Sequence, residues 1–206
     1  MLHMLGQRQL GRALFPVGGQ PKSVTRAHAE RLGLPVAGKP DSQEVCFVPG
    51  ADHAAFLAEH APDLTREGDV VAPDGTVLGR HRGTFRYTIG QRRGLGVSTG
   101  ERAYVVDLVP ATNRVVVGPG DLLCRRGLRA DRVNWVAGAP PDGPLEADVR
   151  IRYNGDDAPA VVEPAGQAGA VVEFRSPQRA IAPGQSAVFY AGDEVLGGGV
   201  IAEAFR

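Results

Sequence analysis

Short runs of apolar residues, separated by turn residues, fill the chain from about residue 68 onward. VVAPDGTVL (70–78) and AYVVDLVPATNRVVVG (103–118) each place two β-branched runs on either side of a turn sequence, which predicts two β-hairpins. Several of the runs that follow, up to residue 202, alternate apolar and polar positions. Short strands at this spacing favour a closed or nearly closed antiparallel barrel over a parallel sheet with crossover helices.

The first sixty residues have a different pattern, which predicts helices and loops. KSVTRAHAERLG (22–33) spaces its apolar residues three to four apart, and Pro21 and Gly33 suit the start and the end of a helix. A second helix is predicted at DHAAFLAEHA (52–61), where the side-chain oxygen of Asp52 can cap the first turn. The fold class that we expect is therefore α+β, mostly β.

The composition is that of a globular protein, and it excludes several classes. The chain has 206 residues, 43% hydrophobic and 22% charged, which argues against disorder. Its 23 basic and 23 acidic residues cancel, which argues against a uniformly basic nucleic-acid binder. No apolar run is long enough to cross a bilayer, and the first residues lack the continuous apolar core of a signal peptide. We therefore expect a cytoplasmic protein without a membrane partner.

Arginine is concentrated between residues 80 and 102. This segment, RHRGTFRYTIGQRRGLGVSTGER, contains six arginines but a single acid, Glu101, together with Phe85 and Tyr87. Arginine forks pair with phosphates and aromatic faces stack on bases, so the segment is a candidate nucleic-acid surface; alternatively, its arginines cover a solvated face of a sheet. GQRRGLG (90–96) does not follow a strand and open a helix, as a dinucleotide site requires, and we interpret it as a glycine-permitted turn.

Two cysteines are too few for a disulfide framework. Cys46 lies in a turn-prone segment, where a thiol can meet a substrate; the alternative, favoured by composition alone, is a small buried hydrophobe. For Cys124 the buried alternative is favoured more strongly, because nothing polar beyond two arginines surrounds it. His53 and His60, with Cys46, provide too few ligands for zinc, so we expect no metal site.

Taken together, these segments resemble the C-terminal two-thirds of the tRNA-specific 2-thiouridylases of the MnmA type. The resemblance extends over essentially the whole chain and keeps the family's motif order. The matching segments are LGQRQLGRALFPVG (5–18), DSQEVCFV (41–48), PDGTVLGRHRG (73–83), YTIGQRRGLG (87–96), YVVDL (104–108), VNW (133–135), RIRY (150–153), APGQSAVFY (182–190) and VLGGGVI (195–201).

The resemblance gives Cys46 a role in sulfur transfer. It implies a persulfide on this cysteine, supplied by a sulfur donor such as a cysteine desulfurase or a sulfur-relay protein. In the family, ATP (with Mg) is used to adenylate the C2 oxygen of the wobble uridine of tRNA, at position 34, and the persulfide sulfur then replaces that oxygen. A persulfide ionises more readily than a thiol, which suits this chemistry.

The resemblance also implies contacts with tRNA. The residues concerned are Arg152, Tyr153 and Gln185, with Arg82, Arg86, Arg92 and Arg93 as further candidates in the arginine-rich segment. Arginine and tyrosine suit phosphate pairing and base stacking, and glutamine can bond base edges or sugars. The alternative is that Arg152 and Tyr153 lie on opposite faces of one barrel strand, LEADVRIRY (145–153), with the tyrosine partly buried.

The chain departs from the family at its start, because the ATP-pyrophosphatase part with its SGGxDS phosphate loop and its partner cysteine is missing. We expect ATP to bind to that part and no cofactor to bind to this chain. We expect residues 1–45 to be the trailing part of the ATP domain with the cysteine loop, 46–117 a β-rich central domain and 118–206 the tRNA-contacting barrel. The chain would then be a truncated piece, or one of two polypeptides, and inactive alone.

Two other functions stay open. The first is a stand-alone RNA-binding β-barrel module without sulfur chemistry, in which Cys46 is inert. The second is a structural module that packs on a separate ATP domain and does not retain tRNA. A sulfur adduct on Cys46 and salt-sensitive binding of tRNA are the observations that separate these functions.

Overall fold

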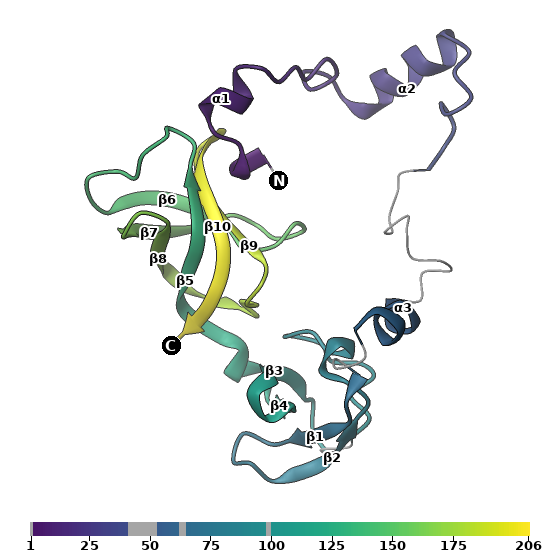
Figure 1. The fold of residues 1–206 in the computed structure, drawn as a ribbon, viewed down its shortest axis with the longest axis vertical. Helices are drawn as coiled ribbons and strands as arrows, with labels where there is room; N and C mark the ends of the chain where they lie inside the picture. Colours follow the sequence, from purple (N-terminus) through teal and green to yellow (C-terminus); the bar gives the residue numbers. More distant parts are fainter. Residues whose placement is uncertain (1, 41–52, 62–64, 98–99) are drawn as a thin grey trace.

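The computed structural model describes residues 2–40, 53–61, 65–97 and 100–206, and it contains two separate β-sheets (Figure 1). One is a four-stranded sheet between residues 68 and 118, and the other is a closed barrel between residues 124 and 205. In the described part of the chain, three short α-helices precede the sheets. The expected fold class, α+β and mostly β, is confirmed.

The C-terminal barrel closes through antiparallel pairings in the order β10-β5-β8-β7-β6-β9. Its strands are β5 (Cys124–Trp135), β6 (Leu145–Arg150), β7 (Ala158–Ala165), β8 (Gly169–Arg179), β9 (Ser186–Ala191) and β10 (Glu194–Phe205). Because every strand has two neighbours, closure leaves no sheet edge with unpaired backbone groups. The predicted antiparallel barrel is confirmed.

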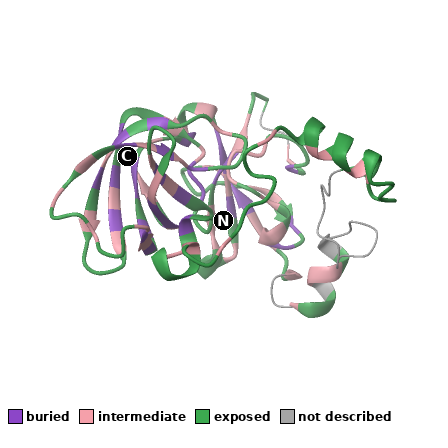
Figure 2. Ribbon diagram, turned by 90° about the horizontal axis from the view of Figure 1, so that it is seen from above, coloured by how far each residue is buried: buried purple, intermediate pink, exposed green. Residues whose placement is uncertain are grey.

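Apolar side chains at every second strand position fill the barrel. In β7, Ala158, Ala160 and Val162 are buried, while the residues between them are exposed or half-buried. Trp135 and Phe189 also belong to the barrel core, and their ring centroids are 5.6 Å apart. Figure 2 shows buried and exposed positions alternating along the barrel strands. A period of two places successive side chains on opposite faces of a strand, which explains why the sequence pattern predicts this core.

The central sheet is built from the two predicted hairpins. Its strands, in the order β2-β1-β4-β3, are β1 (Gly68–Val71), β2 (Val77–His81), β3 (Tyr104–Val109) and β4 (Arg114–Gly118). The hairpins β1–β2 and β3–β4 are joined by a parallel pairing of β1 with β4. Val70, Val105 and Val115 are fully buried in this sheet's own core. Short 3-10 helices connect the strands: η4 (Thr84–Arg86), η5 (Pro110–Thr112) and η6 (Gly120–Leu123).

The N-terminal part consists of η1 (Leu2–Met4), α1 (Gln7–Leu10), α2 (Lys22–Arg31) and α3 (His53–His60). The helix predicted at 22–33 is confirmed as α2, with Pro21 as its N-cap residue and Gly33 after its end at a φ of 65°. The second predicted helix is confirmed as α3, whereas its predicted cap, Asp52, lies outside the described residues. No residue of α2 is buried, so this helix contributes to neither core (Figure 2). Within the described ranges, none of the helices has the length and apolar character needed to span a membrane.

Candidate RNA-binding pocket

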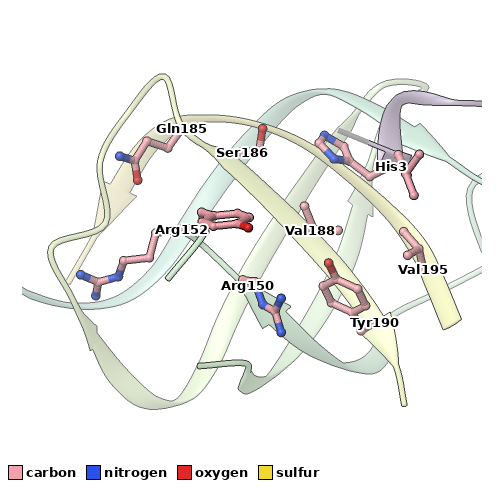
Figure 3. A pocket seen from close by; sticks show the side chains of 10 residues that line it. His3, Arg150, Arg152, Gln185, Ser186, Val188, Tyr190 and Val195 are labelled. Carbon is pink, nitrogen blue, oxygen red and sulfur yellow. The ribbon is translucent and has the colours of Figure 1, made fainter. Parts of the chain in front are cut away.

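An open pocket of about 500 Å³ lies on the barrel, beside β6, β9 and β10 (Figure 3). Its walls come from the end of β6 and the loop after it, from β9 and β10, and from η1 at the start of the chain. The lining residues are Leu2, His3, Arg150, Arg152, Tyr153, Gln185, Ser186, Val188, Tyr190 and Val195. The structure therefore brings together Arg152, Tyr153 and Gln185, for which the family resemblance implies tRNA contacts.

Arg152 and Tyr153 lie in a loop, which corrects the interpretation of residues 145–153 as one strand. β6 ends at Arg150, and the N–H of Gly155 then donates to the carbonyl oxygen of Arg152 at 3.2 Å. The chain must reverse here because β7 pairs antiparallel with β6, beginning with Ala158 opposite Val149. Tyr153 is 94% exposed and not partly buried, so the loop presents it to solvent at the rim of the pocket.

The guanidinium of Arg152 is held by the barrel backbone. Its Nη2 donates to the carbonyl oxygen of Arg179, the last residue of β8, at 2.7 Å. Arg179 in turn contacts the chain before the barrel, since its guanidinium lies 4.7 Å from the centroid of the Tyr104 ring and its Nη1 donates to Gly120. An arginine has five N–H donors, so this single bond orients Arg152 and leaves donors that can pair with a phosphate.

Arg150 is a pocket residue that the sequence analysis did not identify as a candidate. Its Nε and Nη2 donate to the two carboxylate oxygens of Asp157, both at 2.7 Å, and its guanidinium lies 5.4 Å from the centroid of the Tyr190 ring. Hydrogen bonding to Asp157 raises the pKa of Arg150 above its ordinary value. Because Arg150 ends β6 and Asp157 directly precedes β7, this two-pronged pair closes the loop that carries Arg152 and Tyr153.

Gln185 lies in the turn that leads into β9. Gly184 precedes it with a φ of 87°, a conformation that favours glycine. The carbonyl oxygen of Gln185 accepts a hydrogen bond from the N–H of Ile201 at 2.8 Å, and its own N–H donates to Ala182. The backbone is therefore fixed, and the exposed side chain lies at the rim of the pocket (Figure 3).

One wall of the pocket comes from the N-terminal segment, which the sequence analysis also missed. Leu2 and His3 line the pocket from η1, and Figure 3 shows His3 at the opposite end from Arg152. His3 is only 4% exposed, and burial lowers the pKa of its imidazole below the ordinary value of 6.5. The contact of His3 with Asn134 joins positions 131 apart, so no local sequence pattern predicts it.

The lining of the pocket suits a single-stranded nucleic acid. Two arginines, two tyrosines and the polar side chains of Gln185 and Ser186 can pair with phosphates, stack on bases and bond to sugars or base edges. Asp157, the acid that pairs with Arg150, does not line the pocket itself. In the part of the chain that the structure describes, no group of three or more His, Cys, Asp or Glu side chains is placed to hold a metal ion.

The described residues of the arginine-rich segment do not line this pocket. Arg82, Arg86, Arg92 and Arg93 are exposed, and none of them lines it. Arg92 instead lines a separate, more open hollow formed by residues 94–97 and 100–103. The structure therefore separates the predicted tRNA contacts into a barrel set and a central set.

The GQRRGLG sequence forms a turn, as interpreted. Gly90, Gly94 and Gly96 all have positive φ values, between 70° and 90°. The described residues of the segment open no helix at this point. Instead, Leu95 is buried and packs with Tyr87 and Val97 on the core of the central sheet, so the turn covers one side of that sheet.

The structure tests the prediction for only one of the two cysteines, Cys124. Cys46 lies outside the described residues, and its role stays a prediction. The prediction that Cys124 is buried is wrong, because Cys124 is exposed at the first position of β5, opposite Arg179. Its neighbour Leu123 points into the protein and is 1% exposed. The chain changes from the 3-10 helix η6 to strand β5 between these two residues, so the burial of Leu123 does not extend to Cys124.

Three family models match consecutive parts of the chain, and several relatives match nearly all of it. Residues 1–50 match the tRNA methyl transferase HUP domain, residues 54–119 the tRNA methyl transferase PRC-barrel domain, and residues 125–201 the aminomethyltransferase beta-barrel domain. The tRNA-specific 2-thiouridylase MnmA of Roseiflexus sp. (strain RS-1) is 50% identical over 203 residues, which cover 98% of this chain and 54% of the relative. The MnmA proteins of Heliobacterium modesticaldum and Chlorobaculum tepidum are 49% and 48% identical, over 97% and 98% of this chain and 52% and 56% of the relatives.

The chain spans about half the length of the curated relatives that it matches. The three domain matches follow one another in sequence and leave only short gaps, so they account for almost every residue. With identities near one half over nearly the whole chain, the chain belongs to the family of MnmA-type tRNA-specific 2-thiouridylases.

Proposed function

We propose that this chain is the tRNA-binding and sulfur-carrying portion of a tRNA 2-thiouridine synthase that acts on the wobble uridine at position 34. The observation that carries the proposal is the barrel pocket that gathers Arg152, Tyr153 and Gln185. Gln185 lies 32 positions after the adjacent Arg152 and Tyr153 in the sequence, yet all three meet at one open cavity with the chemistry of a single-strand RNA site. The printed names of the relatives, tRNA-specific 2-thiouridylases, support the same substrate.

The role of the pocket is to hold anticodon-loop nucleotides. Arg152, oriented by the carbonyl oxygen of Arg179, pairs with a phosphate, and the exposed ring of Tyr153 stacks on an unpaired base. The reacting uridine must leave its stack for C2 to become accessible. A barrel that holds neighbouring nucleotides lowers the cost of this rearrangement, because part of the loop is already ordered on the protein.

The sulfur chemistry requires three displacements. The C2 oxygen of uridine 34 attacks the α-phosphorus of ATP and releases pyrophosphate. The terminal sulfur of the Cys46 persulfide attacks C2, and AMP leaves with the former carbonyl oxygen. A second thiolate then attacks the sulfur of Cys46, so that the thiolated base is released and a disulfide remains. The resemblance assigns the sites for ATP, Mg and the second thiol to the ATP domain of the family.

The test is a sulfur-loading experiment on the chain itself. After incubation with a cysteine desulfurase and cysteine, peptide mass spectrometry should find one added sulfur atom on Cys46, and none in Cys46→Ser. Cys124→Ser is the matched control, because Cys124 is the other thiol and is exposed; this variant should still be loaded on Cys46. Equal loading of both cysteines, or loading of Cys124 alone, would show that the adduct is non-specific and contradict the role of Cys46.

Binding of tRNA, taken together with the sulfur adduct, separates the proposal from its alternatives. The chain should retain a tRNA transcript with uridine at position 34 in a gel-shift experiment at low salt, and lose it as salt is raised. Retention of tRNA without a sulfur adduct on Cys46 would instead identify a stand-alone RNA-binding module.

A further inference from the structure

Three segments that the family resemblance contains include none of the residues proposed to contact tRNA. They are LGQRQLGR at 5–12, VNW at 133–135 and VLGGGVI at 195–201. In the structure the three segments meet, because η1 and the residues after it pack on β10 and β5 of the barrel (Figure 1). Each segment contributes a different element to this contact.

Asn134 of VNW holds the N-terminal segment by its backbone. The Nδ2 of Asn134 donates to the carbonyl oxygen of His3 at 2.7 Å and to that of Leu5 at 3.2 Å. A third bond runs the other way, from Nε2 of Gln7 to the carbonyl oxygen of Val136 at 2.9 Å. Residues 2–7 are thus fixed to the end of β5 by two side-chain amides, one from each partner.

The glycines of VLGGGVI provide the space for the contact. A Cβ at position 198 would lie 2.9 Å from Cδ2 of His3 and 2.6 Å from the carbonyl oxygen of Ala187. Glycine at 198 therefore lets the imidazole pack directly on the backbone of β10, where His3 is buried. Gly197 and Gly199 do not contact His3 in this way; a Cβ there would meet β5 instead.

The contact joins parts that belong to different domains of the family. The HUP-domain model matches residues 1–50, and the barrel model matches residues 125–201. It also shapes the pocket, since Leu2 and His3 lie in the same lining as Arg152, Tyr153 and Gln185. A segment of the ATP-side domain thereby supplies a wall of a pocket whose other walls come from the barrel.

We propose that residues 2–7 are an inter-domain latch, which Asn134 and Gly198 dock on the barrel so that Leu2 and His3 complete the RNA pocket. The assignment of RNA to this pocket rests on the proposed function, whereas the docking rests on the contacts alone. Asn134 is a positioning residue in this scheme, because it acts through the N-terminal segment. Since docking completes the pocket, RNA binding and docking must stabilise each other to the same extent.

Amide hydrogen exchange in the full chain measures the docking. α1 has only four residues and is not stable as an isolated helix, so its amides are protected only while the segment is docked. Asn134→Ala removes two hydrogen bonds and should speed exchange in residues 5–12 by about tenfold or more. Gln7→Ala removes one bond at an exposed position and should speed it by about threefold to fivefold, without risk to the barrel core.

The matched control is Asn113, whose Nδ2 also donates to two carbonyl oxygens, those of Arg66 and Glu67. Its φ of 51° favours glycine, so Asn113→Gly removes the two bonds without adding backbone strain. This variant should leave exchange in residues 5–12 and affinity for tRNA unchanged.

The second measurement uses a tRNA transcript with uridine at position 34. In the wild-type chain the transcript should slow exchange in residues 5–12, and Asn134→Ala and Gln7→Ala should weaken its binding in the order of their effects on exchange. Unchanged exchange in both variants would overturn the latch, and faster exchange with unchanged affinity for tRNA would overturn its role in the pocket. If the wild-type chain bound no tRNA, the proposed function would fail, while the exchange data would still decide the docking.

Discussion

The barrel pocket and the arginine-rich segment 80–102 both offer arginine and aromatic side chains to RNA, but they hold them differently. In the pocket, Arg152 is bonded to a backbone carbonyl oxygen and Arg150 is bonded to both oxygens of Asp157. In the segment, Arg92 and Arg93 are exposed on a glycine turn. Oriented donors give geometric selection of a phosphate, whereas exposed charges without a fixed partner geometry mainly raise the local potential.

This difference assigns different tasks to the two regions. The net charge of the chain is zero, so long-range attraction for RNA depends on how arginines cluster and not on their total. The segment concentrates exposed positive charge, including Arg82, Arg92 and Arg93, which suits attraction and weak backbone contacts. The pocket fixes a few groups around an open cavity, which suits recognition of nucleotides that have left the stack.

The largest effect on affinity for tRNA is expected for Arg152→Ala. It removes an oriented guanidinium, and a lost charge-assisted hydrogen bond costs about 1.5–3 kcal/mol, so the dissociation constant for tRNA should rise by about tenfold or more. Arg152→Lys keeps the charge but not the fork that bonds to Arg179, and should recover the salt dependence without the affinity. The measurement is fluorescence anisotropy with a labelled transcript over a salt series. An effect of Arg152→Ala no larger than that of Arg92→Ala would remove the distinction between the two regions.

Asp157→Asn is expected to have an intermediate effect on affinity for tRNA. The direction of this change distinguishes an electrostatic role of Asp157 from a positioning role. The substitution removes a negative charge near the pocket, so a purely electrostatic surface would bind RNA more tightly. If the Arg150–Asp157 pair positions the loop of Arg152 and Tyr153, binding should instead weaken, by about twofold to fivefold. Anisotropy titrations at one salt concentration decide between the two signs.

The control for this substitution is Glu203→Gln, which breaks the pair between Arg129 and Glu203 at 2.8 Å on the same barrel. It removes the same charge from a pair that holds no pocket loop, so it should leave binding unchanged or slightly tighter. Weaker binding in both variants would point to a general loss of barrel stability, which thermal unfolding would reveal.

Local patterns in the sequence predict the hairpins and the barrel, but not the pocket. The runs around residues 70–78 and 103–118 carry their turn residues with them, and alternation within a strand specifies which side chains enter the core. The end of β6 could not be predicted in this way, because apolar and polar residues still alternate through Tyr153 while the chain reverses to pair Ala158 with Val149. The same limit applies to His3, whose burial depends on Asn134 and Gly198 in strands far along the chain.

The smallest effect on affinity is expected for Arg92→Ala and Arg93→Ala. Each removes one exposed charge that can neutralise a phosphate, so each should raise the dissociation constant at physiological salt by only about twofold. Each should also reduce the slope of log affinity against log salt by about one, and the double variant by about two. Lysine at the same positions should restore both quantities, because attraction by an exposed charge does not depend on the arginine fork.

The salt series on the Arg92 and Arg93 variants tests whether the arginine-rich segment contributes to tRNA binding through its charge alone. For Arg152 the lysine variant should restore the slope but not the affinity, whereas for Arg92 and Arg93 it should restore both. If lysine failed to restore affinity at Arg92 or Arg93, these side chains would also be making oriented contacts with the RNA. The two regions would then recognise tRNA by the same means.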